Sequence, residues 1–337
     1  MARSAASASG SDDEGFGAVF EEPEDFRPPT PPPTVRTYER RALGGVDPLV
    51  GDSQVQVGLV SGHPLWGHVL YPAAIALARF LELHADRLLH GSDGKGKGKG
   101  KGKAVLELGA GGGLPGLVAA LEGAGNVVIS DFPDPALVNN IAKNIDLNIA
   151  SLDSDEVATA VAKGFTWGTP PDTLLEVVNK SSGDGDGDVQ ERKFDLILLS
   201  DLVFNHSQHL ALLNTCLSCL SSPASSSSSS YSTSKSATET PRETSMPTRP
   251  SKEEGEEESK VDLSDPTTLE TPAVLCFFSH HRPWLVDADL QILQLARDKG
   301  WRVSKVWEDK QAGPAFPEDG GDLAIRSTVH GWLFTRP

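Results

Sequence analysis

Cysteine, long apolar runs and positive charge are all scarce in this sequence, and each shortage excludes a class of protein. Three cysteines among 337 residues are too few for a disulfide framework, so we expect a reducing compartment and a cytoplasmic protein. No apolar stretch approaches the length of a membrane span, and no signal-peptide core is present, so we expect no membrane association. Lysine and arginine number 30 against 47 acidic residues, and the net charge of −17 argues against direct nucleic-acid contact and favours a basic partner.

Spacing typical of a metal site is also missing. Cys216 and Cys219 form a C-x-x-C pair, but no second pair accompanies them, and two small core residues on a helix explain them better. Adjacent histidines seldom ligate one ion together, and no carboxylate or cysteine has partner spacing with them. We therefore predict no metal site. The sequence leaves open whether one of four histidines acts as a general base or whether they shape loops and contact a substrate: His63, His68, His280 and His281.

Several segments have compositions that cannot bury enough apolar surface to offset the entropy of ordering. We expect residues 1–45, which are rich in serine, glycine, proline and acid, to form a mostly disordered arm. The remainder, 46–337, is expected to form one domain of ordinary size. Low-complexity inserts in its surface loops are predicted at 91–103, which includes a strict Lys-Gly alternation, and at 180–191 and 221–272.

Outside these segments, strand and helix patterns alternate five times before a final pair of strands. This alternation predicts an α/β fold: an open, doubly wound sheet of seven mostly parallel strands, with helices on both faces and a terminal antiparallel strand. Strands are predicted at 104–108, 126–130, within 157–167, and at 194–200, 273–278, 301–307 and 325–334. Helices are predicted at 72–89, 114–122, 135–148, 208–220 and 285–299.

A glycine-rich turn follows the first of these strands and indicates a nucleoside-type cofactor. Gly109, Gly111 and Gly113 alternate, and no lysine follows them as in a phosphate-binding loop. Their spacing does not match a dinucleotide-binding fingerprint well. Glu107 at the strand end would repel a pyrophosphate but suits a cofactor with a cationic amino end. Asp131, after the second strand, is placed to accept hydrogen bonds from both ribose hydroxyls. Together these residues favour S-adenosylmethionine.

The carboxyl ends of parallel strands meet at one edge of such a sheet, where ligands bind. The sequence places chemically useful residues at the ends of separate strands, and we expect them to converge on one crevice. They are Glu107, Gly109, Asp131, Trp167, Ser200, Asp201 and the segment 279–283.

Several motifs resemble those of a known enzyme family. Residues 107–113 and Asp131 resemble the first two motifs of the seven-β-strand methyltransferases, and 200–204 resembles the D-x-x-F/Y motif of their lysine-methylating branch. The segments 23–29, 61–68 and 279–283 are similar to the fungal protein N-terminal and lysine N-methyltransferases of translation elongation factor 1-alpha, a group earlier labelled nicotinamide N-methyltransferases. The resemblance implies that the cofactor S-adenosyl-L-methionine is contacted at Trp66, Gly109, Ala110, Gly111, Asp131, Trp167 and Ser200.

Methyl transfer to an amine needs a neutral acceptor nitrogen aligned with the methyl group. We predict that Asp201 orients the amine and helps to receive its proton, and that Phe204 forms part of an aromatic channel, because aromatic faces attract ammonium groups. The structural alternative is that Asp201 caps a helix beginning near Asn205 and that Phe204 packs in the core.

The resemblance implies an enzyme that methylates the N-terminal α-amine and a nearby lysine of translation elongation factor 1-alpha, and we expect a monomer. Two alternatives stay open at this point. One is a small-molecule N-methyltransferase with nicotinamide as acceptor. The other is a cofactor-binding scaffold without catalysis, although the intact motif residues argue against a dead site.

Overall fold

The computed structural model describes residues 32–40, 53–64, 67–91, 96–99, 101–150, 152, 157–180, 192–222 and 269–336. The motif at 23–29 and almost all of the inserts predicted at 180–191 and 221–272 lie outside the described residues. No helix in the described part of the chain is long and apolar enough to cross a membrane.

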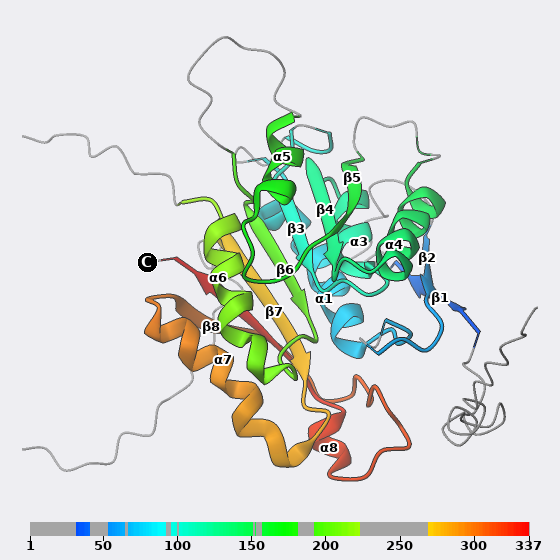
Figure 1. Ribbon diagram of the computed structural model, residues 1–337, viewed down its shortest axis with the longest axis vertical. Helices are drawn as coiled ribbons and strands as arrows, with labels where there is room; N and C mark the ends of the chain where they lie inside the picture. Colours follow the sequence, from blue (N-terminus) through cyan, green and yellow to red (C-terminus); the bar gives the residue numbers. More distant parts are fainter. Residues whose placement is uncertain are drawn as a thin grey trace, which may run out of the picture.

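A seven-stranded sheet forms the centre of the described structure (Figure 1). Its strand order is β5-β4-β3-β6-β7-β9-β8, and only β9 runs antiparallel to its neighbours. The predicted fold class is therefore confirmed, with the chain's last strand inserted between β7 and β8. The strands are β3 (Ala104–Leu108), β4 (Asn126–Asp131), β5 (Thr159–Gly164), β6 (Leu196–Ser200), β7 (Ala273–Ser279), β8 (Arg302–Asp309) and β9 (Val329–Thr335).

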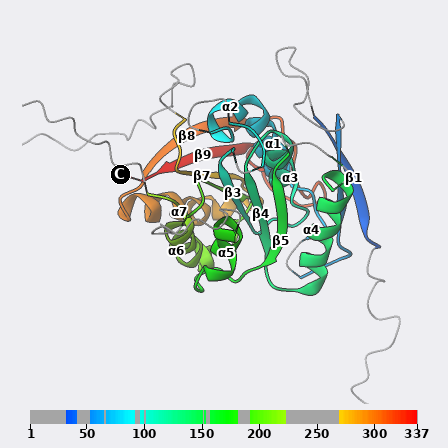
Figure 2. The same ribbon diagram turned by 90° about the horizontal axis from the view of Figure 1, so that it is seen from above.

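Helices cover both faces of the sheet (Figure 2). Alternate residues of each central strand enter different cores: Val105 and Leu198 pack with α1, α3 and α4, whereas Leu106 and Ile197 pack with α5, α6 and α7. The helices are α1 (Pro72–Leu83), α2 (Ala85–Leu88), α3 (Leu114–Leu121), α4 (Pro135–Asn148), α5 (Asp172–Lys180), α6 (His209–Cys219), α7 (Val286–Asp298) and α8 (Leu323–Arg326), with 3₁₀ turns η3 (His206–Gln208) and η4 (Pro283–Leu285).

The structure corrects several of the predicted elements. The helix expected at 72–89 is broken at His84 into α1 and α2, and α5 and α8 were not predicted. A two-stranded antiparallel hairpin of β1 (Thr34–Glu39) and β2 (Gln54–Leu59) was also missed, and β1 lies inside the arm expected to be disordered. Two asparagines of α4 hold β2: Asn144 accepts a hydrogen bond from the Gly58 N–H and Asn148 accepts one from the Gln56 N–H, both at 2.9 Å.

The end of the Lys-Gly insert is tied to the domain. The Gly98 N–H donates to the Gly123 carbonyl at 2.8 Å, and the side chain of Lys103 donates to the Arg87 carbonyl. A Cβ at Gly102 would lie 2.3 Å from the Gly123 carbonyl oxygen, so this close backbone approach requires glycine. Part of the Lys-Gly segment thus contains glycine because its backbone packs closely against Gly123. The composition of the segment does not reveal this contact.

Candidate active site

The glycine turn between β3 and α3 borders a cavity. Gly109, Gly111 and Gly113 all have positive φ, at 61°, 56° and 79°. A Cβ at Gly109 would lie 2.6 Å from a methyl group of Leu202 and 3.0 Å from the ring of Trp167, so only glycine fits beneath these side chains. A Cβ at Gly111 would meet nothing within 4 Å, because this part of the backbone faces open space. The turn therefore presents bare main chain to a ligand.

Asp131, the last residue of β4, is held beside this turn. Its Oδ2 accepts the Gly111 N–H at 2.7 Å, and its Oδ1 accepts the Phe132 N–H at 2.6 Å. Burial raises the pKa of the Asp131 carboxyl, although both backbone hydrogen bonds favour the ionised form. The carboxylate is thus fixed in orientation at the mouth of the glycine turn.

Glu107 does not line the cavity, and its contact with the cofactor stays a prediction. Its side chain lies beneath α3 with no exposed surface, and its Oε2 accepts the Gly116 N–H at 2.8 Å. Glu107 is not among the residues that line the cavity, whereas Asp201, which is also buried, is one of them. Burial, opposed by the Gly116 hydrogen bond and aided by the charge of Asp131, raises the pKa of Glu107 to about 8. Glu107 thus links β3 to α3 through this hydrogen bond.

The cavity has a volume of about 700 Å³, within the range of small-molecule sites. Ser200 and Asp201, at the end of β6, line it together with Asp131 and the glycine turn, and so does Trp167 from the turn after β5. The structure thus brings together most of the predicted site residues. Trp66 lies outside the described residues. The predicted residues that line the cavity are Gly109, Ala110, Gly111, Asp131, Trp167, Ser200, Asp201 and Phe204.

Asp201 has an unusual backbone, with φ at 59°. Its N–H donates to the Phe277 carbonyl at 2.7 Å, and its Oδ1 accepts the Ser279 N–H at 3.3 Å. Its Oδ2 is buried without a hydrogen-bond partner among the described residues. These contacts show that Asp201 bridges β6 to β7 and does not cap the following helix. Asp201 thus combines an almost fully buried side chain with a place in the cavity lining.

A second cavity of about 180 Å³ adjoins the first, and Tyr71 and Phe204 line both. Phe204 is 40% exposed, so the alternative that it packs in the core is wrong. Tyr71, Phe316 and His281 form a cluster of rings with centroids 5.5–6.0 Å apart. Burial and the nearby charge of Asp201 raise the pKa of the Tyr71 hydroxyl, which therefore stays protonated. The second cavity is aromatic on one side and suits a cationic or amine group.

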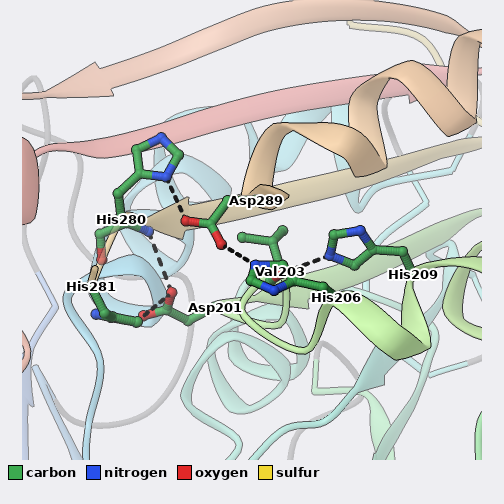
Figure 3. Close-up of polar contacts among 8 residues, drawn as sticks. Asp201, Val203, His206, His209, His280, His281 and Asp289 are labelled. Carbon is green, nitrogen blue, oxygen red and sulfur yellow. Dashed lines mark hydrogen bonds and ion pairs between the residues drawn. The ribbon is translucent and has the colours of Figure 1, made fainter. Parts of the chain in front are cut away.

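The two adjacent histidines at the end of β7 contact different aspartates (Figure 3). His281 Nε2 lies 3.1 Å from Asp201 Oδ1. Burial disfavours the charged imidazole, but the charge and hydrogen bond of Asp201 outweigh it and raise the pKa of His281. His280 Nδ1 lies 2.7 Å from Asp289 Oδ2. This divergence explains the pair without a shared metal ion.

Asp289 joins two loops that carry the site. Its Oδ1 lies 2.7 Å from His206 Nε2 on η3, while its Oδ2 contacts His280, and the carboxylate is buried (Figure 3). His209 Nε2 contacts the Val203 carbonyl at 2.6 Å and so fixes the turn before η3. Three residues at the site were not predicted, because each comes from an element without a motif: Asp289, Tyr71 and Phe316.

Asp289→Asn is expected to lower the free energy of unfolding by about 1–3 kcal/mol, because the amide keeps one acceptor oxygen and replaces the other with a donor. Urea unfolding would measure this loss. Asp287→Asn, on the exposed face of the same helix, is the matched control and should leave the midpoint unchanged. Equal stability of both variants would show that the two histidine contacts contribute little.

Comparison with known proteins gives the family of this chain. A family model described as lysine methyltransferase matches residues 61–241. A protein N-terminal and lysine N-methyltransferase of Schizosaccharomyces pombe is 34% identical over 97% of this chain and 97% of its own length. Enzymes of the same description from Cryptococcus neoformans and Neurospora crassa are 35% and 32% identical, over 94% and 97% of this chain and 87% and 90% of their own lengths.

Solved structures give a more distant likeness. An S-adenosylmethionine-dependent methyltransferase of Streptococcus mutans matches 83% of this chain at a TM-score of 0.42 and 10% identity. A methyltransferase complexed with S-adenosylhomocysteine matches at 0.41 and 12% identity, also over 83% of this chain. The aligned region spans about half of those chains, 53% and 54%. The sequence comparisons show that this chain belongs to the family of protein N-terminal and lysine N-methyltransferases, enzymes that depend on S-adenosylmethionine.

Proposed function

We propose that this enzyme methylates the N-terminal α-amine and a nearby lysine of translation elongation factor 1-alpha. The single observation that carries the proposal is the pair of adjoining cavities, one bordered by the glycine turn and Asp131, the other by aromatic rings and carboxylates. The motifs shared with the elongation-factor methyltransferases and the net charge of −17, which suits a basic protein substrate, support it further. We also propose that it acts as a monomer in the cytoplasm.

The larger cavity fits the cofactor. We assign the ribose hydroxyls to Asp131, whose carboxylate is already oriented by two backbone hydrogen bonds. The open main chain at Gly111 admits the cofactor, and the Trp167 ring supplies a flat wall near the turn. Ser200 and Ala110 complete the contacts that the resemblance implies, with Trp66 from the segment outside the described residues. When bound, S-adenosylmethionine supplies an electrophilic methyl group on a sulfonium centre.

The chain's own residues would prepare the acceptor. The unpartnered Oδ2 of Asp201 can accept a hydrogen bond from the incoming amine and hold its lone pair toward the larger cavity. Phe204 and Tyr71 stand between the two cavities, where their ring faces attract an ammonium group before it loses its proton. His281 Nε2, 3.1 Å from Asp201 Oδ1, helps to fix the orientation of that carboxylate.

Incubation with radiolabelled S-adenosylmethionine tests the proposal. Purified elongation factor 1-alpha, nicotinamide and no acceptor form three parallel reactions. Label in the elongation factor, located by mass spectrometry at its N-terminus and a nearby lysine, supports the proposal. Label in nicotinamide alone would favour the small-molecule alternative. Cofactor binding without transfer to any acceptor, including a cell extract, would favour a non-catalytic scaffold.

Asp131→Ala is expected to weaken cofactor binding at least about tenfold, a loss of roughly 1.4 kcal/mol, because both ribose hydrogen bonds disappear. Isothermal titration calorimetry with S-adenosylhomocysteine would measure it. Asp146→Ala removes an exposed carboxylate of α4 and is the matched control, with affinity expected to match the original protein. Unchanged affinity of Asp131→Ala would remove this residue from the cofactor site.

A further inference from the structure

Two large apolar side chains are exposed beside the smaller cavity. Trp284, on η4, is 71% exposed, and Leu323, at the start of α8, is 59% exposed. The Trp284 value is the highest among the exposed large apolar residues of the described chain. Covering exposed tryptophan and leucine side chains with a partner removes apolar surface from water and so favours binding. Tryptophan is also enriched among the interface residues that contribute most of the binding free energy.

These two side chains belong to segments that meet at the cavity mouth. A Cβ at Gly321 would lie 3.1 Å from the ring of Pro283, so the chain just before Leu323 abuts the chain just before Trp284. The same two segments supply Arg282, Leu285, Phe316 and Asp319 to the cavity lining. We name the surface formed by residues 282–287 and 316–323 the Trp284 rim. Figure 1 shows α8 and the start of α7 together at one end of the molecule.

The Trp284 rim is held in place from below. Arg326 is buried and donates hydrogen bonds to the carbonyls of Phe316 and Asp319. Asp322 caps α8 by accepting the N–H groups of Ala324 and Ile325, at 2.8 and 3.3 Å. Because these hydrogen bonds already order the backbone of the rim, binding a partner costs little further conformational entropy of the rim.

The charge of the rim is acidic. The residues 282–287 and 316–323, all of them described, carry one basic side chain, Arg282, against four exposed acidic side chains. Such a surface repels acidic partners and attracts basic ones. The exposed acidic residues are Asp287, Glu318, Asp319 and Asp322.

We propose that the Trp284 rim docks the basic segment of the substrate protein that adjoins the acceptor amine. The inference rests on the proposed function and deepens it, because it assigns protein recognition to a surface that extends from the mouth of the smaller cavity to Trp284 and Leu323, which line neither cavity. Trp284 and Leu323 cover apolar atoms of that segment, and the four carboxylates face its lysines and arginines. A small acceptor such as nicotinamide would fill the cavity without covering Trp284 or Leu323.

Steady-state methylation of full-length elongation factor 1-alpha tests the rim. Trp284→Ser is expected to raise the KM for the protein at least tenfold, with kcat within twofold and S-adenosylhomocysteine affinity unchanged. Leu147→Ser removes a 55% exposed apolar side chain on α4 and is the matched control, with KM expected to stay the same. Glu318→Lys is expected to raise KM about threefold at low salt, and the effect should vanish at high salt.

The outcomes separate this inference from the proposed function. If the unsubstituted enzyme does not methylate the elongation factor, the proposed function fails before the rim is tested. If it does, and Trp284→Ser has an unchanged KM, the rim is not the docking surface. An equal loss in Trp284→Ser and Leu147→Ser would also overturn it, because that loss would then be general to exposed apolar residues.

Discussion

Asp201→Asn is expected to reduce methyl transfer by about 10²–10⁴-fold, the range for loss of a positioned acid–base group. The amide keeps the size of the side chain, and an oxygen can still accept the Ser279 N–H. It cannot, however, carry the negative charge that orients the amine and receives its proton. Incorporation of labelled methyl groups into elongation factor 1-alpha would measure the loss, and cofactor affinity should stay within about threefold.

The positive φ of Asp201 determines which controls are useful. Asparagine tolerates this backbone region almost as well as glycine, whereas alanine adds strain of about 1 kcal/mol. Asp201→Ala therefore lowers both the activity and the stability of the fold. Asp201→Gly removes the side chain without adding backbone strain. We expect all three variants to be nearly inactive despite different melting temperatures. Activity that follows melting temperature would mean that Asp201 acts only through the fold.

The sheet and the cavity residues could be predicted because their signals are local. A continuous apolar run such as 194–200 shows a central strand, and the residue after a strand end must lie at the carboxyl edge of the sheet. Ser200, Asp201 and Asp131 were therefore placed correctly. The β1–β2 hairpin escaped because β1 is mostly exposed and lies in a polar, proline-rich neighbourhood. The hairpin is held through β2, which buries Val55, Val57 and Leu59 in the core and bonds to the asparagines of α4.

The second cavity could not be predicted for a different reason. Tyr71 precedes a helix, Phe316 lies in the connection after β8, and Asp289 lies on α7, so only the folded chain brings them together. The direction of the Glu107 side chain, by contrast, could have been predicted from the alternation of residues along the strand. Residues 105 and 107 share one face of β3, and Val105 packs toward α3, so Glu107 had to point beneath that helix as well.

That buried carboxyl should control how stability depends on pH. The pKa of Glu107 rises from an ordinary 4.5 to about 8 in the folded protein, so the folded state binds more protons than the unfolded state between these values. Stability from this group is therefore complete below pH 4.5 and declines as pH rises toward 8. The full difference is on the order of 5 kcal/mol, and the part between pH 6 and pH 8 is roughly half of it.

Glu107→Gln is expected to flatten this decline. The glutamine oxygen can accept the Gly116 N–H as Glu107 Oε2 does, and the amide cannot ionise. Its NH₂ group would replace Oε1, which is buried without a hydrogen-bond partner among the described residues and is therefore costly when charged.

Urea unfolding between pH 5.5 and 8.5 would give the free energy of unfolding for both proteins, with Asp146→Asn as an exposed control. Asp131, whose pKa burial also raises, is present in every variant and so cancels in the difference. Parallel curves for the original protein and Glu107→Gln would show that Glu107 keeps an ordinary pKa beneath α3. A gap that widens from pH 5.5 to about pH 8 and then stays constant would show that the carboxyl stays protonated in the folded enzyme at neutral pH.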